Sequence, residues 1–275
     1  MIALDAVTRK LSAALMKLVV FAGFAFMSLP IVLVIWLSFF SDALLVVPPS
    51  GYSVQWYFSI FEQPQFLNGF LLSLQVALLG AAMGLLVSIP ASLVLVRARF
   101  PGRTAILNLL TAPLTVPSIV IGAGLYVTFI EIEIYSGLPL VGSVWGLGVA
   151  HVLITIPWCV RLITSNLVGL DVSIQEAALS LGATPLVTLF KVTLPMIWSG
   201  IVAAALFSFV ISFGNLELSL FLVAPGDTTL PIAILQYLQW KIDPTIAAVS
   251  VLQIVVIGGG LLITDRFVSL TGVVR

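Results

Sequence analysis

Six long stretches of the sequence are almost entirely apolar, and shorter polar segments separate them. The stretches lie at about residues 18–40, 70–96, 104–130, 144–167, 197–223 and 245–264. A helix needs roughly 20 apolar residues to cross the hydrocarbon core of a bilayer, and each stretch is long enough to do so. The pattern predicts an all-α membrane protein in which residues 1–275 form one domain of six transmembrane helices.

The composition agrees with a membrane protein and excludes several other classes. Hydrophobic residues make up 61% of the chain and charged residues only 8%, whereas roughly a quarter of the residues in a soluble domain are charged. The formal net charge is zero, so no basic field would attract nucleic acid. The single cysteine, Cys159, excludes an internal disulfide and a multi-cysteine metal site. A cleavable signal peptide is not expected, because the first apolar run continues to about residue 40 without a cleavage pattern.

The basic residues predict the orientation of the six spans. Ten of the eleven fall on one face of the membrane, and only Lys241 falls on the other. The ten are Arg9, Lys10, Lys17, Arg97, Arg99, Arg103, Arg161, Lys191, Arg266 and Arg275. Because Lys and Arg gather on the cytoplasmic side, this face and both termini are predicted to be cytoplasmic. The acidic residues fall mostly outside, at Asp42, Glu62, Glu131, Glu133, Asp227 and Asp243.

Little in the sequence could catalyse a reaction. His151 is the only histidine, and neither a Gly-x-Ser-x-Gly elbow nor a His-Glu-x-x-His helix occurs. We expect His151 to form a hydrogen bond to a neighbouring helix, and an intramembrane Ser–His pair is the alternative. The sequence also lacks Gly-x4-Gly-Lys-Ser/Thr, so any use of nucleotide energy requires another chain. No catalytic residue and no metal site are predicted.

Prolines and glycines inside the apolar runs indicate helices that bend and pack closely. Glycines one helical turn apart occur at 80–84 and at 142–146, and both pairs are predicted to allow close helix packing. Glu217 is the one acidic residue predicted to lie within a span, where it either faces a cavity or partner or extends to the nearby outer interface. The prolines predicted to kink or loosen helices are Pro90, Pro113, Pro117 and Pro157.

The connection between the fourth and fifth spans is too polar to cross a membrane, yet it has the pattern of two short helices. Ser173-x-x-Glu176 reads as a capping box that begins the first helix. Gly182 suits the left-handed position that ends a helix. Thr184 and Pro185 then favour the start of a second helix, predicted to run to about residue 192. The exposed small-residue and leucine face of such a cytoplasmic loop indicates docking against a partner.

The segment "EAALSLGATPLVTLFKVTLP" resembles the EAA loop of binding-protein-dependent ABC importer permeases. The loop, at about 171–195, keeps that family's spacing, with Val192 in place of the usual Ile. In the family the first short helix is a coupling helix that docks in a groove of the cytoplasmic ATPase. The resemblance implies that Glu176 makes capping and polar contacts and that Gly182 provides the turn. The implied ATPase-coupling residues are Glu176, Ala177, Ala178, Leu181, Gly182, Ala183, Leu194 and Pro195.

The resemblance also implies a location and a set of partners. The chain is expected in the bacterial inner membrane, surrounded by lipid, beside a second, homologous permease that is expected to be a different chain. Two cytoplasmic ATPase subunits would bind ATP and Mg²⁺, and an extracytoplasmic protein would bind the substrate. No cofactor is expected in this chain.

Three further segments, "VPPSGYSVQWY", "APLTVPSIVIGAGLY" and "SFGNLELSLFLVAPGDTTLPIAILQYLQ", are similar to the family branch that carries polyamines, opines and related amines. Within it, the chain resembles the shorter, second permease. Permeases for polyamines often have acidic residues where this chain has Gly214 and Asn215. This departure counts against a highly cationic substrate, and Glu217 is the acid that could compensate. The candidate substrate-path residues are Pro117, Ser212, Phe213, Asn215 and Glu217.

An ion-gradient-driven secondary transporter is the alternative function. It would need ion-coordinating acids near the bilayer centre and an internal repeat. Glu217 is the only candidate acid, and the sequence contains no convincing repeat. The pattern therefore favours a permease subunit that forms half of a translocation pathway and is driven by a separate ATPase.

Overall fold

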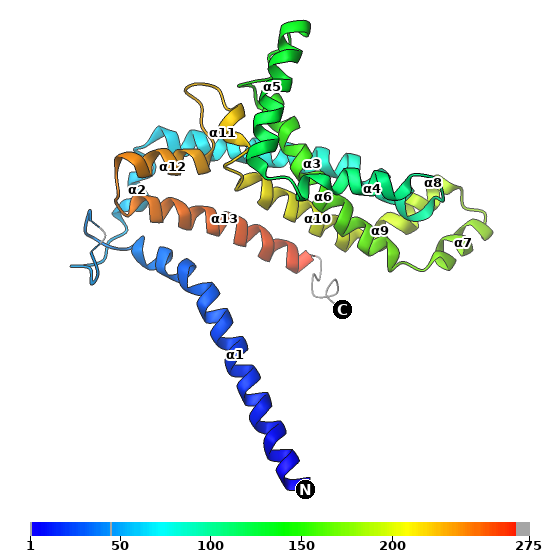
Figure 1. Cartoon of the computed structure of the whole chain (residues 1–275), viewed down its shortest axis with the longest axis horizontal. Helices are drawn as coiled ribbons and strands as arrows, with labels where there is room; N and C mark the ends of the chain where they lie inside the picture. Colours follow the sequence, from blue (N-terminus) through cyan, green and yellow to red (C-terminus); the bar gives the residue numbers. More distant parts are fainter. Residues whose placement is uncertain (1, 45, 268–275) are drawn as a thin grey trace. The chain divides into compact units, whose positions relative to one another are not determined.

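A computed structural model of the chain describes residues 2–44 and 46–267. Arg275 and the side chains of Arg9, Lys10 and Arg266, which the sequence assigns to the cytoplasmic face, lie outside the described part. The described residues form helices and no β-sheet (Figure 1). The elements are α1 Ile2–Leu37, α2 Gln55–Ser59, α3 Pro64–Arg97, α4 Arg103–Thr111, a 3₁₀ turn Ala112–Leu114, α5 Ser118–Ser136, α6 Val144–Val168, α7 Val172–Ser180, α8 Pro185–Thr188, a π-helical turn Leu189–Thr193, α9 Leu194–Met196, α10 Trp198–Phe213, α11 Ser219–Leu222, α12 Leu230–Trp240 and α13 Thr245–Phe267.

Five helices are long and apolar enough to span a bilayer, and a bent helix pair makes a sixth candidate. The pair joins Pro185–Met196 to Trp198–Phe213 at an angle of 67°. The predicted fold class, an all-α membrane protein, is therefore confirmed. The five continuous candidate spans are Ser12–Leu37, Pro64–Arg97, Ser118–Ser136, Val144–Val168 and Thr245–Leu262.

The chain divides into two compact units. One comprises Met1–Glu62 and Tyr237–Gln253, and the other comprises Gln63–Gln236 and Ile254–Arg275. In the first unit, the indole N–H of Trp56 donates to the backbone oxygen of Phe40 over 2.6 Å. The second unit contains the loop between α6 and α10 and all the candidate site residues.

The prediction of one continuous helix over 104–130 is wrong. The run is divided into α4, the 3₁₀ turn and α5, with Pro117 immediately before α5. Pro113 and Pro117 lack the N–H donors that would continue the helical ladder, so α4 ends and a new helix begins. The new helix α5 then continues to Ser136 and includes Glu131 and Glu133, which the sequence had placed in the outer loop. Pro90 and Pro157, by contrast, lie inside the continuous helices α3 and α6.

The prediction of one helix over 197–223 is also wrong. Helix α10 ends at Phe213, and the chain runs through turns before the short helix α11 begins at Ser219. The side-chain oxygen of Asn215 accepts a hydrogen bond from the backbone N–H of Leu218 over 2.9 Å, which satisfies a donor freed by the break. Glu217 therefore lies exposed in a turn rather than within a helix.

Helices α3, α6 and α10 pack together as the core of the second unit. The glycine pair at 80–84 lies where α3 meets α6, as predicted. The hydroxyl of Thr155 donates to the backbone oxygen of Gly80 over 3.0 Å, and a Cβ added to Gly84 would lie 2.5 Å from the Thr155 Oγ1. The pair at 142–146 does not form such a crossing, because Gly142 lies in the turn before α6 with φ 76°.

Replacing Gly84 by alanine is expected to destabilise the protein by roughly 1–3 kcal/mol, the usual effect of overpacking a well-filled site. Thr155 is buried and its hydroxyl is bonded to Gly80, so it cannot rotate away without losing that bond. Unfolding of the purified protein in a denaturing-detergent titration measures the change.

Gly124→Ala in α5 is the matched control, because nothing lies within 4 Å of the added Cβ. This variant should be as stable as the parent or slightly more stable. Equal stability of both variants would contradict the close crossing of α3 and α6.

Candidate functional site

The first helix of the loop, α7, is capped by Asp171 and not by the predicted Ser173. The Asp171 carboxylate accepts the backbone N–H of Ser173 over 2.9 Å, and Ser173 lies inside the helix. This backbone hydrogen bond, with a further one from the Ser173 side chain, lowers the pKa of Asp171 below its usual value. A carboxylate whose pKa is lowered by folding contributes stability above its unfolded pKa and loses it only as the pH falls through the lowered value. The cap is therefore fully charged at neutral pH.

Helix α7 ends in a Schellman motif. Gly182 has φ 88°, the left-handed conformation that glycine adopts without strain. The backbone N–H of Gly182 donates to the Leu179 oxygen over 3.0 Å, and that of Ala183 donates to the Ala178 oxygen over 3.1 Å. These two bonds satisfy carbonyl groups that would otherwise lack partners at the helix end.

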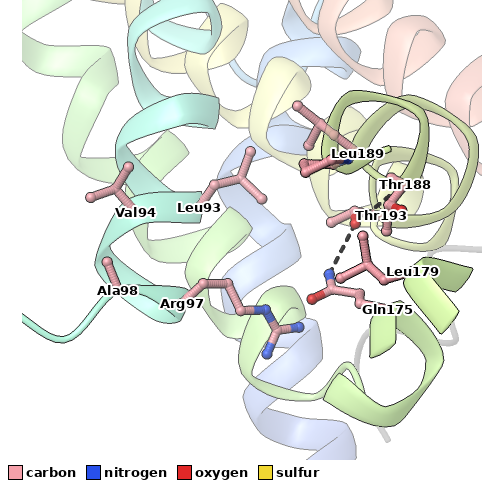
Figure 2. Close-up of a pocket in the computed structure, with 10 residues that line it drawn as sticks. Leu93, Val94, Arg97, Ala98, Gln175, Leu179, Thr188, Leu189 and Thr193 are labelled. Atoms are coloured by element: carbon pink, nitrogen blue, oxygen red, sulfur yellow. Dashed lines mark hydrogen bonds between the residues drawn. The ribbon is translucent and has the colours of Figure 1, made fainter. Parts of the chain in front are cut away.

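The second helical part of the loop continues past the predicted end near residue 192. Thr184 caps α8 by accepting the backbone N–H of Val187 over 3.4 Å, and α8 leads through the π-helical turn into α9. Pro195 cannot donate a backbone hydrogen bond. Two residues earlier, the Thr193 hydroxyl donates to the Thr188 oxygen over 3.3 Å. Gln175 Nε2 donates to Thr193 Oγ1 over 2.9 Å and so joins α7 to the second part of the loop (Figure 2).

The loop presents an exposed face around the end of α7. Leu181 is 90% exposed, and Glu176, Ala177 and Gly182 are also exposed. Ala178, Ala183 and Leu194 are half-buried, and Pro195 is exposed in α9. Six of the eight predicted coupling residues thus lie together on α7 and its final turn, while Leu194 and Pro195 lie at the opposite end of the loop.

Arg97 links the loop to the end of α3, a contact that the sequence did not reveal. Its Nη2 donates to the backbone oxygen of Leu170, in the connection between α6 and α7, over 3.3 Å. In the sequence, Arg97 is only one of the ten basic residues that predict which face of the membrane is cytoplasmic. No spacing rule relates it to a carbonyl group 73 positions later in the chain.

The candidate substrate-path residues lie at the two broken spans. Ser212 and Phe213 are buried at the end of α10, and Asn215 is half-buried beyond it. Glu217 is exposed in the turn before α11, and Pro117 is exposed at the start of α5. Helix α5 packs on α11, where the site of an added Cβ on Gly122 lies 3.1 Å from the Leu218 Cα.

His151 contacts both sides of the break between α10 and α11, which lies in the predicted fifth span. Its Nδ1 lies 2.7 Å from the Ser212 oxygen, and its Nε2 lies 3.1 Å from the Ser219 oxygen. The Ser219 hydroxyl donates to the Asn215 backbone oxygen over 2.9 Å, so it must accept from Nε2–H. This leaves Nδ1 to accept the hydroxyl proton of Ser212, which assigns the ring as a neutral Nε2–H tautomer. The predicted hydrogen bond from His151 to a neighbouring helix is confirmed.

The geometry argues against a hydrolytic Ser–His pair at this position. His151 is 1% exposed, and Ser212 and Ser219 are buried with it. Both ring nitrogens bond to serine oxygens, and no carboxylate within the described residues orients the ring. A nucleophile needs access to a substrate and a base held by a third group, and this cluster has neither.

Comparison with known proteins identifies the family. The model of the family described as "Binding-protein-dependent transport system inner membrane component" matches residues 84–270. The chain belongs to this family. It is 33% identical to the putrescine transport system permease protein PotI of Escherichia coli strain K12 over 237 residues, which cover 86% of this chain and 84% of PotI. It is 27% identical to the spermidine/putrescine transport system permease protein PotC of the same strain, over 92% of this chain and 96% of PotC.

A solved structure supports the same fold. The bacterial alginate ABC transporter in complex with an alginate pentasaccharide-bound periplasmic protein has a chain that matches with a TM-score of 0.71 and 18% identity, over 95% of both chains. This permease is therefore the transmembrane subunit of an ABC importer and a multi-pass protein of the inner membrane. As a member of the binding-protein-dependent family of importer permeases, it works with an ATPase and a substrate-binding protein. A secondary transporter is not favoured.

Replacing His151 by leucine is expected to destabilise the permease by about 2–4 kcal/mol, because the buried Ser212 hydroxyl loses its partner and the buried Ser219 hydroxyl keeps only its bond to Asn215. A double-mutant cycle with Ser219→Ala isolates one of the two bonds. The coupling energy should lie between about 0.6 and 1.7 kcal/mol, the average and the maximum found by such cycles for side-chain hydrogen bonds inside a membrane protein.

Unfolding of the four purified proteins of the cycle in a denaturing-detergent titration measures this energy. Replacing the buried Ser92 by alanine is the control for the loss of a buried hydroxyl, because its oxygen has no hydrogen-bond partner in the described structure. Additive effects of His151→Leu and Ser219→Ala would contradict the bond.

Proposed function

We propose that this permease forms half of the pathway for a polyamine or a related amine and is driven through its loop between α6 and α10. Both termini lie in the cytoplasm, and ATP and Mg²⁺ are bound by the ATPase subunits. The observation that carries the coupling role is the exposed face at the end of α7, where the C-cap residue Leu181 is almost fully exposed. A rigid helix that presents small and apolar side chains suits insertion into a groove of a partner.

The loop is joined firmly enough to the helix bundle to transmit a displacement. Arg97 bonds to the start of the loop and Gln175 bonds to Thr193 within it. Helix α6 then runs without a break from this region to His151, about 25 Å away along the helix axis. His151 contacts both sides of the break in the fifth span. A loop position favoured by ATP binding would therefore bias the arrangement of the broken span, which is the linkage that an importer requires.

The roles within the loop follow from exposure. Ala177 and Leu181 make the docking contacts, with Ala178 and Ala183 at their edge. Glu176 contributes a polar contact at the rim. Gly182 sets the turn, and Leu194 and Pro195 pass the motion to α10.

A second, different permease completes the pathway. Helix α5 exposes apolar side chains along its length, among them Ile119, Val127 and Ile134. A broken span such as this one is tolerated at membrane depth where it is covered by protein or lines a watery cavity. A homologous partner permease provides that cover, in keeping with the resemblance to the second permease of a pair.

The substrate proposal rests on the relatives, whose names specify putrescine or spermidine. Glu217 provides an exposed carboxylate in the turn beside the broken span, where an amine could be neutralised. Pro117, Ser212, Phe213 and Asn215 shape that segment. Phe213 is held by ring contacts with Phe70 and Phe209 at centroid distances of 5.8 and 5.4 Å.

Leu181→Asp is expected to weaken association with the ATPase about thirtyfold, the effect of losing a contact worth about 2 kcal/mol. Folding should be unaffected, because the side chain is 90% exposed. Co-purification of the ATPase with the tagged permease measures the loss.

The control is Leu44→Asp, which places the same charge on another exposed leucine in the connection between α1 and α2. It should leave ATPase association unchanged. Normal co-purification of the ATPase with the Leu181→Asp variant would overturn the coupling role of this face.

Cells that lack this permease are expected to regain uptake of labelled putrescine when it is restored. Glu217→Gln should raise the KM for putrescine about tenfold, the effect of removing one charged partner from a cation. Uptake kinetics in the complemented strain measure both results.

Asp227→Asn is the matched control, because Asp227 is also an exposed acid in the connection after α11. It should leave the KM unchanged. Restored uptake of a neutral amino acid but not of putrescine would exclude the polyamine proposal. An unchanged KM in the Glu217→Gln variant would exclude Glu217 from the path.

A further inference from the structure

A cavity of about 480 Å³ lies between the end of α3 and both parts of the loop (Figure 2). One wall comes from the last turns of α3 and the other from α7, α8 and the π-helical turn. Most of the lining is apolar. The lining residues are Leu93, Val94, Arg97, Ala98, Gln175, Leu179, Pro185, Thr188, Leu189 and Thr193.

Two polar atoms of the cavity wall are buried without a hydrogen-bond partner. They are the Nε of Arg97 and the Oγ1 of Thr188, whose residue is only 5% exposed. Buried donors and acceptors in native proteins are almost always satisfied, and an unmet one costs about 1–3 kcal/mol. The two residues that carry these atoms line one cavity, Arg97 from α3 and Thr188 from α8, so a single occupant with polar atoms lies within reach of both residues.

The positive charge of Arg97 indicates which kind of molecule the cavity would bind. Figure 2 shows the Arg97 guanidinium extending from α3 toward Gln175. Within the described part of the chain, Arg97 forms no ion pair, and no acidic side chain lines the cavity. An anionic group is therefore favoured near Arg97. The leucines and the proline of the walls require that the rest of the occupant be apolar, which water or free phosphate cannot provide.

The position of the cavity matches the level of lipid headgroups. Arg97 is the last residue of α3, a candidate membrane span, and Arg99 and Arg103 follow it. Basic pockets between transmembrane helices on the cytoplasmic side are typical binding places for anionic headgroups. The cytoplasmic assignment of this end rests on the proposed orientation of the permease.

We propose that this cavity binds an anionic phospholipid of the inner leaflet. The phosphate group accepts hydrogen bonds from Arg97, Gln175 and Thr188, and an acyl chain lies along Leu93, Leu179 and Leu189. The bound lipid touches both α3 and the loop, so it steadies the loop against the bundle. ATP hydrolysis by the importer then depends on anionic lipid, a consequence that rests on the proposed coupling role.

Lipid binding is tested separately from hydrolysis, on the complete importer purified through this permease. Native mass spectrometry of the importer with phosphatidylglycerol and with phosphatidylcholine measures occupancy. Arg97→Gln should lower the affinity for phosphatidylglycerol about fivefold, the effect of one basic residue near an anionic headgroup. Ala98→Leu, which fills the cavity and keeps Arg97, should lower occupancy by both lipids.

Arg99→Gln is the matched control, because Arg99 is a neighbouring arginine that does not line the cavity. It should retain the preference for phosphatidylglycerol. Equal loss of that preference in Arg97→Gln and Arg99→Gln would reduce the effect to general surface charge and overturn the site. Competition by inorganic phosphate alone would overturn the lipid as the occupant. Weaker ATPase binding by Arg97→Gln with unchanged lipid occupancy would make the cavity a protein contact instead.

In nanodiscs, ATP hydrolysis by the parent importer should rise with phosphatidylglycerol content, and Arg97→Gln should abolish this rise. If lipid binds but hydrolysis does not respond, the site stands and its effect on the coupling loop fails. If hydrolysis is absent in every variant although lipid occupancy differs between them, the proposed function fails and the lipid site stands.

Discussion

The absence of water inside a bilayer is the constraint on which this structure depends, because every backbone group freed by a break must find a partner within the protein. The permease has two broken apolar runs, and the break after α10 shows such bonds. Asn215 accepts the backbone N–H of Leu218 after α10 ends, and the Ser219 hydroxyl donates to the Asn215 oxygen. His151 completes this group from α6. At this break, the side chains of Asn215 and Ser219 bond to backbone groups, and His151 bonds to the side chains of Ser212 and Ser219.

Helix α6 connects the two regions that matter for transport. Its first half carries His151, which bonds to both sides of the break between α10 and α11, and its C-terminal end leads directly into the capped loop. The glycine pair of α3 lets that helix lie close along α6, and Arg97 at the end of α3 bonds to Leu170. Since one continuous helix joins both regions, the proposed displacement of the loop by a partner would reach the residues around the break. The physical link is packing and hydrogen bonding within one compact unit.

Local signals in the sequence were sufficient for much of the loop. Gly182 takes the left-handed conformation because only glycine adopts it without strain, and Thr184 with Pro185 begins the next helix. The cap of α7 was placed wrongly, since Ser173 and Asp171 are both good capping residues and the choice depends on how the chain leaves α6. Hydrophobic runs predicted the spans but not their breaks. At 104–130 and 197–223 the apolar pattern continues through residues that are not helical, because hydropathy does not register lost backbone donors.

By itself, the sequence determined that the chain is an all-helical membrane protein, where its apolar runs lie, and that it carries the loop of an importer permease. These features depend on composition and on spacing along the chain, which need no neighbours in space. The tertiary structure alone decided that His151 bonds to Ser212 and Ser219, that Arg97 meets Leu170, and that a cavity separates α3 from the loop. Each of these contacts joins residues that are distant in the chain. They form because helices packed at close range must satisfy one another's polar groups.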